Sequence, residues 1–190
     1  SVRPEEESDS ISASVRMVHK KDKKRFFDTR IGARSGDVFV KTRYKREFEL
    51  SDVSLFKVEP ALYYFIKDGW GERLLMQYEY QSSPKVQYRL NYSIRGSQSF
   101  SGIRWKHGLY RLHQIDNHTA SMMGLIVNGE RNGSEGFFVD TYSLNYRYRF
   151  NAYKEWLFFE VEPFFEWPRE FDYKFTPGIA LRVEGYFSKK

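Results

Sequence analysis

The residue types with the clearest chemical potential are a histidine and a serine at His118 and Ser121. A histidine beside a serine hydroxyl can activate that hydroxyl as a nucleophile. Here the histidine follows an Asp-Asn turn and is followed directly by Thr119, and a turn histidine of this kind is far more common than a catalytic one. We therefore assign no catalytic residue and expect a protein that is not an enzyme.

Two further histidines, His107 and His113, stand six positions apart and would share one face of an extended strand. Two imidazoles on one face could begin a metal site, but a structural or catalytic zinc site needs at least three protein ligands. The sequence offers no third ligand, so a polar break in an aromatic strand is the favoured interpretation. We expect no metal and no cofactor.

Carboxylates and cations are also grouped. Glu160, Glu162 and Glu166 share one strand face. Paired carboxylates can transfer protons, but the favoured role here is to neutralise the positive charge of enclosed arginines. The basic run 20–25 could bind phosphates of lipid or nucleic acid, and a solvated connector is its favoured interpretation. Elsewhere cations and aromatic rings alternate onto opposite faces, whereas a single-strand nucleic-acid platform needs them together, so we expect no nucleic-acid partner.

The elements that position these groups show a period of two. In 85–95 and 141–150 every second residue is apolar and the residues between them are polar or charged. The stretches 38–50, 56–66, 157–167 and 179–187 repeat the pattern, and only Arg46 interrupts the apolar side of the first of them. This alternation predicts β-strands and excludes amphipathic helices.

Turn-like pieces separate these stretches at nine places between residues 35 and 172, which delimits ten strands in a β-domain of residues 26–190. The strands within 100–115 and 118–128 alternate least well. Residues 11–19 alternate too, so 1–25 is either an N-terminal periplasmic segment or an extra strand, and twelve strands is the alternative count.

Composition narrows the fold class. The 190 residues are 18% aromatic and 29% charged, with a mean hydropathy of −0.67 and a formal net charge of +6. No uncharged apolar run approaches the roughly 18 residues of a membrane helix, and aromatic residues at this level argue against disorder. The absence of cysteine excludes disulfides and thiolate chemistry.

The chemistry of the two strand faces favours a transmembrane antiparallel up-and-down β-barrel. One face is rich in Tyr, Phe and Leu with aromatic residues near strand ends, as in membrane barrels, whereas the other carries both signs of charge and could fill a lumen. A hairpin turning near residue 171 would place Glu160 opposite Arg182. The predicted lipid-facing residues are Tyr88, Leu90, Tyr92, Leu144, Tyr146, Tyr148, Leu181 and Val183. The predicted lumen charge network is Arg89, Arg147, Arg149, Glu160, Glu162, Arg182 and Glu184.

Strand parity predicts the orientation. An even strand number returns both termini to the periplasm, which places the connections 35–36, 68–69, 96–97, 128–136 and 168–172 outside. The loop 128–136 is the longest and most polar of these connections. Trp70, Trp105, Trp156 and Trp167 are expected in an aromatic girdle or at the lumen rim.

The closing segment 176–187, TPGIALRVEGYF, resembles the C-terminal assembly signal of bacterial outer-membrane barrels, although Leu181 and Val183 replace the usual aromatics and three residues follow Phe187. The stretches 155–170 and 68–72 are similar to an uncharacterised group of gammaproteobacterial outer-membrane proteins. The likeness covers about residues 40–187. It implies the fold and a Gram-negative outer-membrane location, and no activity.

These observations lead to one main expectation and two alternatives. The main one is a non-enzymatic outer-membrane barrel, either a structural or partner-binding component or a narrow, porin-like pore with a charge-filled lumen. Its expected partners are outer-membrane lipid and lipopolysaccharide, the barrel assembly machinery and another envelope protein. The first alternative is an outer-membrane enzyme acting on lipid or lipopolysaccharide, since residues 117–121 faintly resemble outer-membrane phospholipases and lipid A deacylases. The second is a soluble ligand-binding β-barrel.

Overall fold

The strict alternation of the sequence appears as a single sheet of long strands. The computed structural model describes residues 12–22, 24–34, 37–133, 136–153 and 157–185. Within these residues no helix is both long enough and apolar enough to cross a membrane. The strands are β1 (Ser12–Asp22), β2 (Arg25–Arg34), β3 (Asp37–Ser51), β4 (Ser54–Phe65), β5 (Gly69–Ser83), β6 (Val86–Ser97), β7 (Phe100–Gln114), β8 (Thr119–Asn132), β9 (Gly136–Tyr153), β10 (Leu157–Pro168) and β11 (Thr176–Gly185).

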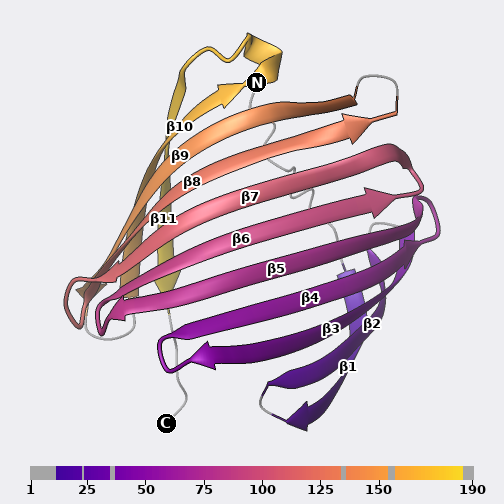
Figure 1. The fold of residues 1–190 in the computed structure, drawn as a ribbon, viewed down its shortest axis with the longest axis horizontal. Helices are drawn as coiled ribbons and strands as arrows, with labels where there is room; N and C mark the ends of the chain where they lie inside the picture. Colours follow the sequence, from indigo (N-terminus) through magenta and orange to yellow (C-terminus); the bar gives the residue numbers. More distant parts are fainter. Residues whose placement is uncertain (1–11, 23, 35–36, 134–135, 154–156, 186–190) are drawn as a thin grey trace.

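Each strand pairs antiparallel with the next one along the chain, in the order β1 to β11 without a crossover. Figure 1 shows the sheet curving, with β10 and β11 turning behind the strands in front. We call the end with the β1/β2, β3/β4, β5/β6 and β7/β8 turns end A, and the opposite end, with the β4/β5, β6/β7 and β10/β11 connections, end B. The architecture is an up-and-down antiparallel β-sheet.

The strand count differs from the expected ten. The additional strand is β1, which pairs with β2 from Ser12↔Arg34 to Asp22↔Arg25, so the alternating stretch 11–19 belongs to the sheet from residue 12 onward. Strands β1 and β11 are the two edges. Because eleven strands alternate in direction, these two edges run the same way, and no pairing between them is present in the described part of the chain.

The expected external loop at 128–136 is mostly strand, which corrects that prediction. Residues 128–132 of β8 remain paired with β9, and Asn132 lies opposite Gly136. The β-bulge between Asn128 and Gly129 lets the ladder continue through a polar sequence with three glycines nearby. Among the described connections the longest is 169–175, between β10 and β11, which contains the 3-10 turn η1 (Arg169–Phe171).

The sheet has one apolar and one ionic face. A row of apolar residues crosses β6 to β10 at one height, since the register places Leu90, Leu109, Leu125, Leu144 and Phe165 opposite one another in turn. The side chains of this face are well exposed, 52% for Leu90 and 72% for Leu181. Buried apolar residues number only two among those described, Ala61 and Tyr63, so there is no conventional hydrophobic core.

Aromatic rings lie over glycines on the ionic face. A Cβ at Gly71 would collide with the Tyr63 ring, one at Gly124 with Tyr110 and the Asn145 side chain, and one at Gly178 with Phe164. In all three cases the ring and the glycine are direct cross-strand partners. The missing side chain therefore gives the ring a place against the backbone.

Candidate functional site: the ionic inner face

The difference in exposure between the two faces indicates that the ionic face is the concave side of the curved sheet. Its acidic residues are buried: Asp28, Glu79, Glu160 and Glu162 are each 8% exposed or less. Side chains crowd together on a concave surface and spread apart on a convex one, which explains why the apolar face is the exposed one. Buried carboxylates need charged or hydrogen-bonding partners, and these partners define the candidate site.

Six of the seven expected network residues lie together on β9, β10 and β11. Glu160 is opposite Arg149 on one side and Arg182 on the other, which is the register expected for this hairpin. Arg182 Nη1 lies 2.5 Å from Glu162 Oε2, and Arg147 Nη2 lies 2.8 Å from the same oxygen. The network continues at its margin, where Arg149 Nη2 is 3.0 Å from Glu184 Oε2. Positive and negative groups are thus closely matched here.

Arg89, the seventh residue, lies elsewhere on the ionic face. It forms an ion pair with Glu79, 3.1 Å from Nε to Oε1, across the β5/β6 pair. Lys57 on β4 donates to the other oxygen of Glu79 at 2.9 Å, and Gln77 also donates to this carboxylate. Glu79 therefore joins three neighbouring strands.

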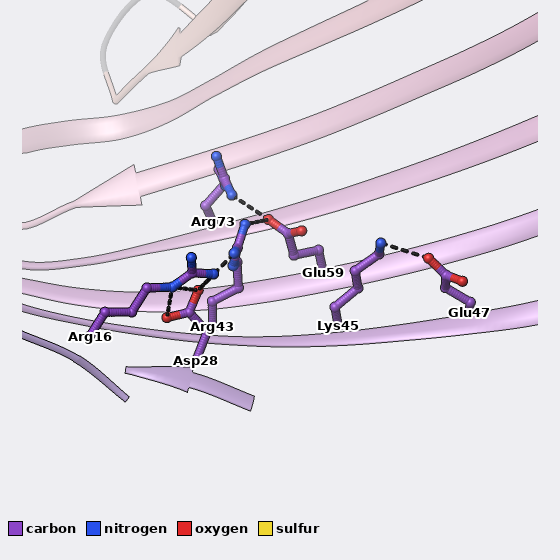
Figure 2. A network of polar contacts seen from close by, with 7 residues as sticks. All are labelled: Arg16, Asp28, Arg43, Lys45, Glu47, Glu59 and Arg73. Atoms are coloured by element: carbon purple, nitrogen blue, oxygen red, sulfur yellow. Dashed lines mark hydrogen bonds and ion pairs between the residues drawn. The ribbon is translucent and has the colours of Figure 1, made fainter. Parts of the chain in front are cut away.

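A third network, which the sequence did not single out, crosses β1 to β5 (Figure 2). Asp28 accepts hydrogen bonds from Arg16 and Arg43, each with a shortest distance of 2.7 Å. Glu59 then bridges Arg43 at 3.5 Å and Arg73 at 2.7 Å. In the same view Lys45 pairs with Glu47 at 2.6 Å on β3.

The signal for this third network is present in the sequence. Residues 41, 43, 45, 47 and 49 carry charge on alternate positions of β3, and each falls on the face opposite to Val38, Val40 and Tyr44. What the pattern could not supply is the pairing of Asp28 with both Arg16 and Arg43, because this depends on the β1/β2 and β2/β3 registers.

Beside the third network lie cations without a carboxylate partner. Arg30, Lys41 and Arg95 form no ion pair within the described part of the chain. Arg95 instead donates from Nε to the Tyr63 hydroxyl at 2.8 Å, with its guanidinium over the Tyr63 ring. A recess of about 150 Å³ is lined by Lys41, Tyr63, Arg73 and Arg95, among other residues. A second recess of about 80 Å³ adjoins it at Lys41 and is lined by Asp28, Arg30 and Arg43. We call Arg30, Lys41, Arg43, Arg73 and Arg95 the cationic cluster.

The histidine candidates lie away from the ionic face. His107 and His113 are both on the apolar face, where His107 packs against the Tyr92 and Trp105 rings. The described residues hold no group of three or more possible metal ligands. His118 lies in the β7/β8 turn, and Ser121 lies opposite His113 on β8.

The turn around His118 has a structural role. The backbone N–H of His118 donates to Asp116 Oδ1 at 2.7 Å. This bond is the main reason that the pKa of the Asp116 carboxyl lies below its usual value. No hydrogen bond joins the His118 and Ser121 side chains among the described residues. The geometry is that of a fixed turn rather than a nucleophile beside its base.

The aromatic residues of the apolar face gather near its ends. Trp70 packs on Tyr64 with ring centroids 5.0 Å apart, and Trp167 lies opposite Tyr142, both toward end B. Trp105 is also on the apolar face, toward the same end. Toward end A, Tyr80 faces Tyr88. Glu155, Trp156, Tyr186 and Phe187, together with residues 1–11, lie outside the described residues.

All eight residues expected to face lipid are on the apolar face. Tyr88, Leu90 and Tyr92 pair with Tyr80, Tyr78 and Met76 of β5. Tyr148 connects through Val161 to Leu181, and Val183 lies opposite Phe159. Leu144 and Tyr146 pair with Leu125 and Met123. The exposed fraction of this set reaches 72% at Leu181.

Comparisons with known proteins bear on the fold. No protein-family model matches the sequence, and no curated protein matches it. Among solved structures, a KdgM porin has a TM-score of 0.54 at 8% sequence identity, with 94% of this chain and 96% of that chain covered. The KdgM porin in complex with disordered oligogalacturonate has a TM-score of 0.53 at 9% identity, with the same coverage. At such low identity the likeness concerns the fold alone: this chain has the antiparallel up-and-down β-fold of a porin barrel.

Proposed function

We propose that this protein spans the bacterial outer membrane as a β-barrel and serves there as a narrow, non-enzymatic pore for small anionic solutes. The single observation that carries this proposal is the separation of the two sheet faces. One face exposes apolar and aromatic side chains, and the other buries carboxylates among an excess of arginine and lysine. The porin fold supports the proposal.

The apolar face supports the membrane location. A water-soluble monomer rarely exposes a contiguous apolar patch beyond a few hundred Å². Here the row from Leu90 to Phe165 crosses five strands, and Leu181 and Val183 extend the exposed apolar surface to the β11 edge. Aromatic residues near both ends match the girdles of membrane barrels. This arrangement favours lipid and lipopolysaccharide contact over the soluble-barrel alternative, and insertion by the barrel assembly machinery follows from the location.

The cationic cluster supports anion passage. Within the described residues, its five basic residues, Arg30, Lys41, Arg43, Arg73 and Arg95, have only Asp28 and Glu59 as acidic partners. Three of the five therefore keep a positive charge that a passing anion can meet. One similar structure is a KdgM porin in complex with oligogalacturonate, an acidic saccharide. An acidic saccharide is the solute class that this cluster would suit.

The decisive experiment is single-channel recording of the reconstituted protein in a planar bilayer with a KCl gradient. We expect small, resolved conductance steps and a reversal potential that shows a preference for chloride. In the variant Arg30→Gln/Lys41→Gln/Arg95→Gln, which removes the three cations without carboxylate partners, the reversal potential should shift toward cation preference. These substitutions leave the ion pairs of Asp28 and Glu59 in place.

The matched control is Arg111→Gln/Arg131→Gln, which removes two cations from the apolar face. Its selectivity should equal that of the unchanged protein. A folded, bilayer-inserted protein that does not conduct would contradict the pore and leave a structural or partner-binding component as its role. Equal chloride and potassium permeability in the unchanged protein would contradict anion passage.

A further inference from the structure

We propose that Arg25 and Arg46 form a binding site for the phosphate group of an anionic phospholipid at end A of the apolar face. The inference rests on the proposed function, because it requires this face to meet lipid. It deepens that function by naming one lipid class and one place on the barrel surface.

Arg46 is a cation on the apolar face, between two aromatic neighbours of the same strand. It is exposed, and its neighbours two positions away on the same face of β3 are Tyr44 and Phe48. Its guanidinium lies 4.5 Å from the centre of the Phe48 ring, and it forms no ion pair among the described residues. A charge in contact with hydrocarbon is unfavourable unless it meets a counter-charge or the headgroup region.

A second arginine lies directly opposite. Arg25, the first residue of β2, is the cross-strand partner of Arg46. Like charges in direct cross-strand positions destabilise a sheet unless something offsets them. Arg25 has one carboxylate partner, Asp22, at 2.6 Å, and that carboxylate also accepts the backbone N–H of Lys24. Arg46 is therefore left as the uncompensated member of the pair.

The turn itself adds to the positive charge. Lys20 and Lys21 are exposed and form no ion pair in the described part of the chain, whereas Lys24 pairs with Glu49 at 2.5 Å. Lys20 and the Glu49 partner of Lys24 belong to the ionic face, so the apolar side of the turn holds two arginines, Arg25 and Arg46, with Asp22 as the acidic partner of Arg25. The basic run of the sequence and the one charge that interrupts the apolar side of β3 meet at the same place.

The apolar surface beside this site fits an acyl chain. A groove of about 530 Å³ on the same face is lined by Phe27, Tyr44, Leu62, Leu74 and Ile94, among other residues. Phe27 is two positions from Arg25 and Tyr44 is two positions from Arg46, so the groove begins next to the two guanidiniums. A phospholipid would place its phosphate beside the arginines and an acyl chain in the groove. A soluble phosphate would contact the arginines and leave the groove empty.

The test measures lipid binding to the folded protein in a neutral detergent by native mass spectrometry. Dioleoyl phosphatidylglycerol and dioleoyl phosphatidylcholine, which differ in headgroup charge, are titrated separately. We expect phosphatidylglycerol to bind more tightly. In Arg25→Gln/Arg46→Gln its affinity should fall roughly 30-fold, because each cation near a membrane surface contributes about a fivefold factor. The control Arg111→Gln removes a cation from the same face and should change the affinity little.

Three outcomes would overturn the site. They are equal binding of the two lipids, an unchanged phosphatidylglycerol affinity in the double variant, and displacement of the lipid by millimolar inorganic phosphate, which would make free phosphate the ligand. Conductance is recorded in bilayers of phosphatidylcholine alone, so it does not depend on this site. If the protein conducts normally but shows no preference for phosphatidylglycerol, only the proposed lipid site is disproved. If the protein does not insert into the bilayer at all, the proposed pore is disproved as well.

Discussion

At the scale of single residues, the ionic face is organised around carboxylates that each bind more than one cation. Glu162 lies between Arg147 and Arg182 and also accepts a hydrogen bond from Asn145 at 2.8 Å. Such sharing lets few acids neutralise many bases in a confined space. Removing one carboxylate therefore leaves several like charges facing one another, and the cost exceeds that of a surface pair.

Glu79 provides the test of this argument. Glu79→Ala should lower the free energy of unfolding by about 2–3 kcal/mol, because it leaves Lys57 and Arg89 close together without their acid. Urea unfolding in lipid vesicles, followed by tryptophan fluorescence, measures the change. The control is Glu49→Ala, whose pair with Lys24 is well exposed and should contribute less than about 1 kcal/mol. Equal losses in the two variants would show that sharing has no special effect.

At the scale of elements, the alternation of the sequence determines the face of each residue but not its neighbours. It assigned Tyr88, Leu90 and Leu181 to one face, and the structure has them there. The β10/β11 register also followed from the sequence, because one turn near residue 171 brings Glu160 opposite Arg182. The cationic cluster did not follow, because it depends on four successive registers from β2 to β6, and each bulge changes what lies opposite.

Strand β1 shows a second limit of sequence analysis. Its residues alternate, but Val18 falls on the ionic face opposite Asp28, and the strand ends in a run of lysines. The pattern alone therefore could not separate a strand from a connector. The loop expected at 128–136 was wrong for a related reason, since glycine and asparagine there accompany a bulge and continued pairing.

Cysteine crosslinking tests the β10/β11 register. The chain has no cysteine, so introduced pairs report without background. Glu166→Cys/Thr176→Cys replaces two direct partners next to the β10/β11 connection and should form a disulfide on mild oxidation, because directly opposite Cβ atoms are about 4.5–5.5 Å apart. Mobility on a non-reducing gel gives the result. The diagonal pair Glu166→Cys/Gly178→Cys should crosslink far less, and preferential crosslinking of that pair would indicate a register shifted by two residues.

At the scale of the whole molecule, the two ends differ in their connections. End B carries the longest described connection, 169–175, whereas the other described turns are short at both ends, for instance 52–53 and 84–85 at end A and 66–68 and 98–99 at end B. That connection is fixed to β9: the Tyr173 hydroxyl donates to the Val139 carbonyl at 2.6 Å, and the Arg169 guanidinium lies over the Phe138 ring. Membrane barrels have short periplasmic turns and longer external loops, which favours end B as the external end.

Surface labelling of intact cells tests this orientation. In Asp172→Cys the thiol lies in the end B connection and should react with a membrane-impermeant maleimide added from outside. In Asp52→Cys it lies in the β3/β4 turn at end A and should react only after the outer membrane is permeabilised. The unchanged protein, which has no thiol, is the blank. Labelling of residue 52 but not residue 172 on intact cells would reverse the orientation.

The rings that lie over Gly71, Gly124 and Gly178 also bear on how the bore of such a protein could change. Each ring stays close to the wall because its neighbour has no side chain, so the free cross-section depends on where glycines occur as much as on which large residues point inward. Replacing one of these glycines with alanine would push its ring away from the backbone and, in the proposed pore, narrow the passage while the strand pairing stays the same. The free cross-section and the pairing of the strands can therefore be changed independently of each other, one residue at a time.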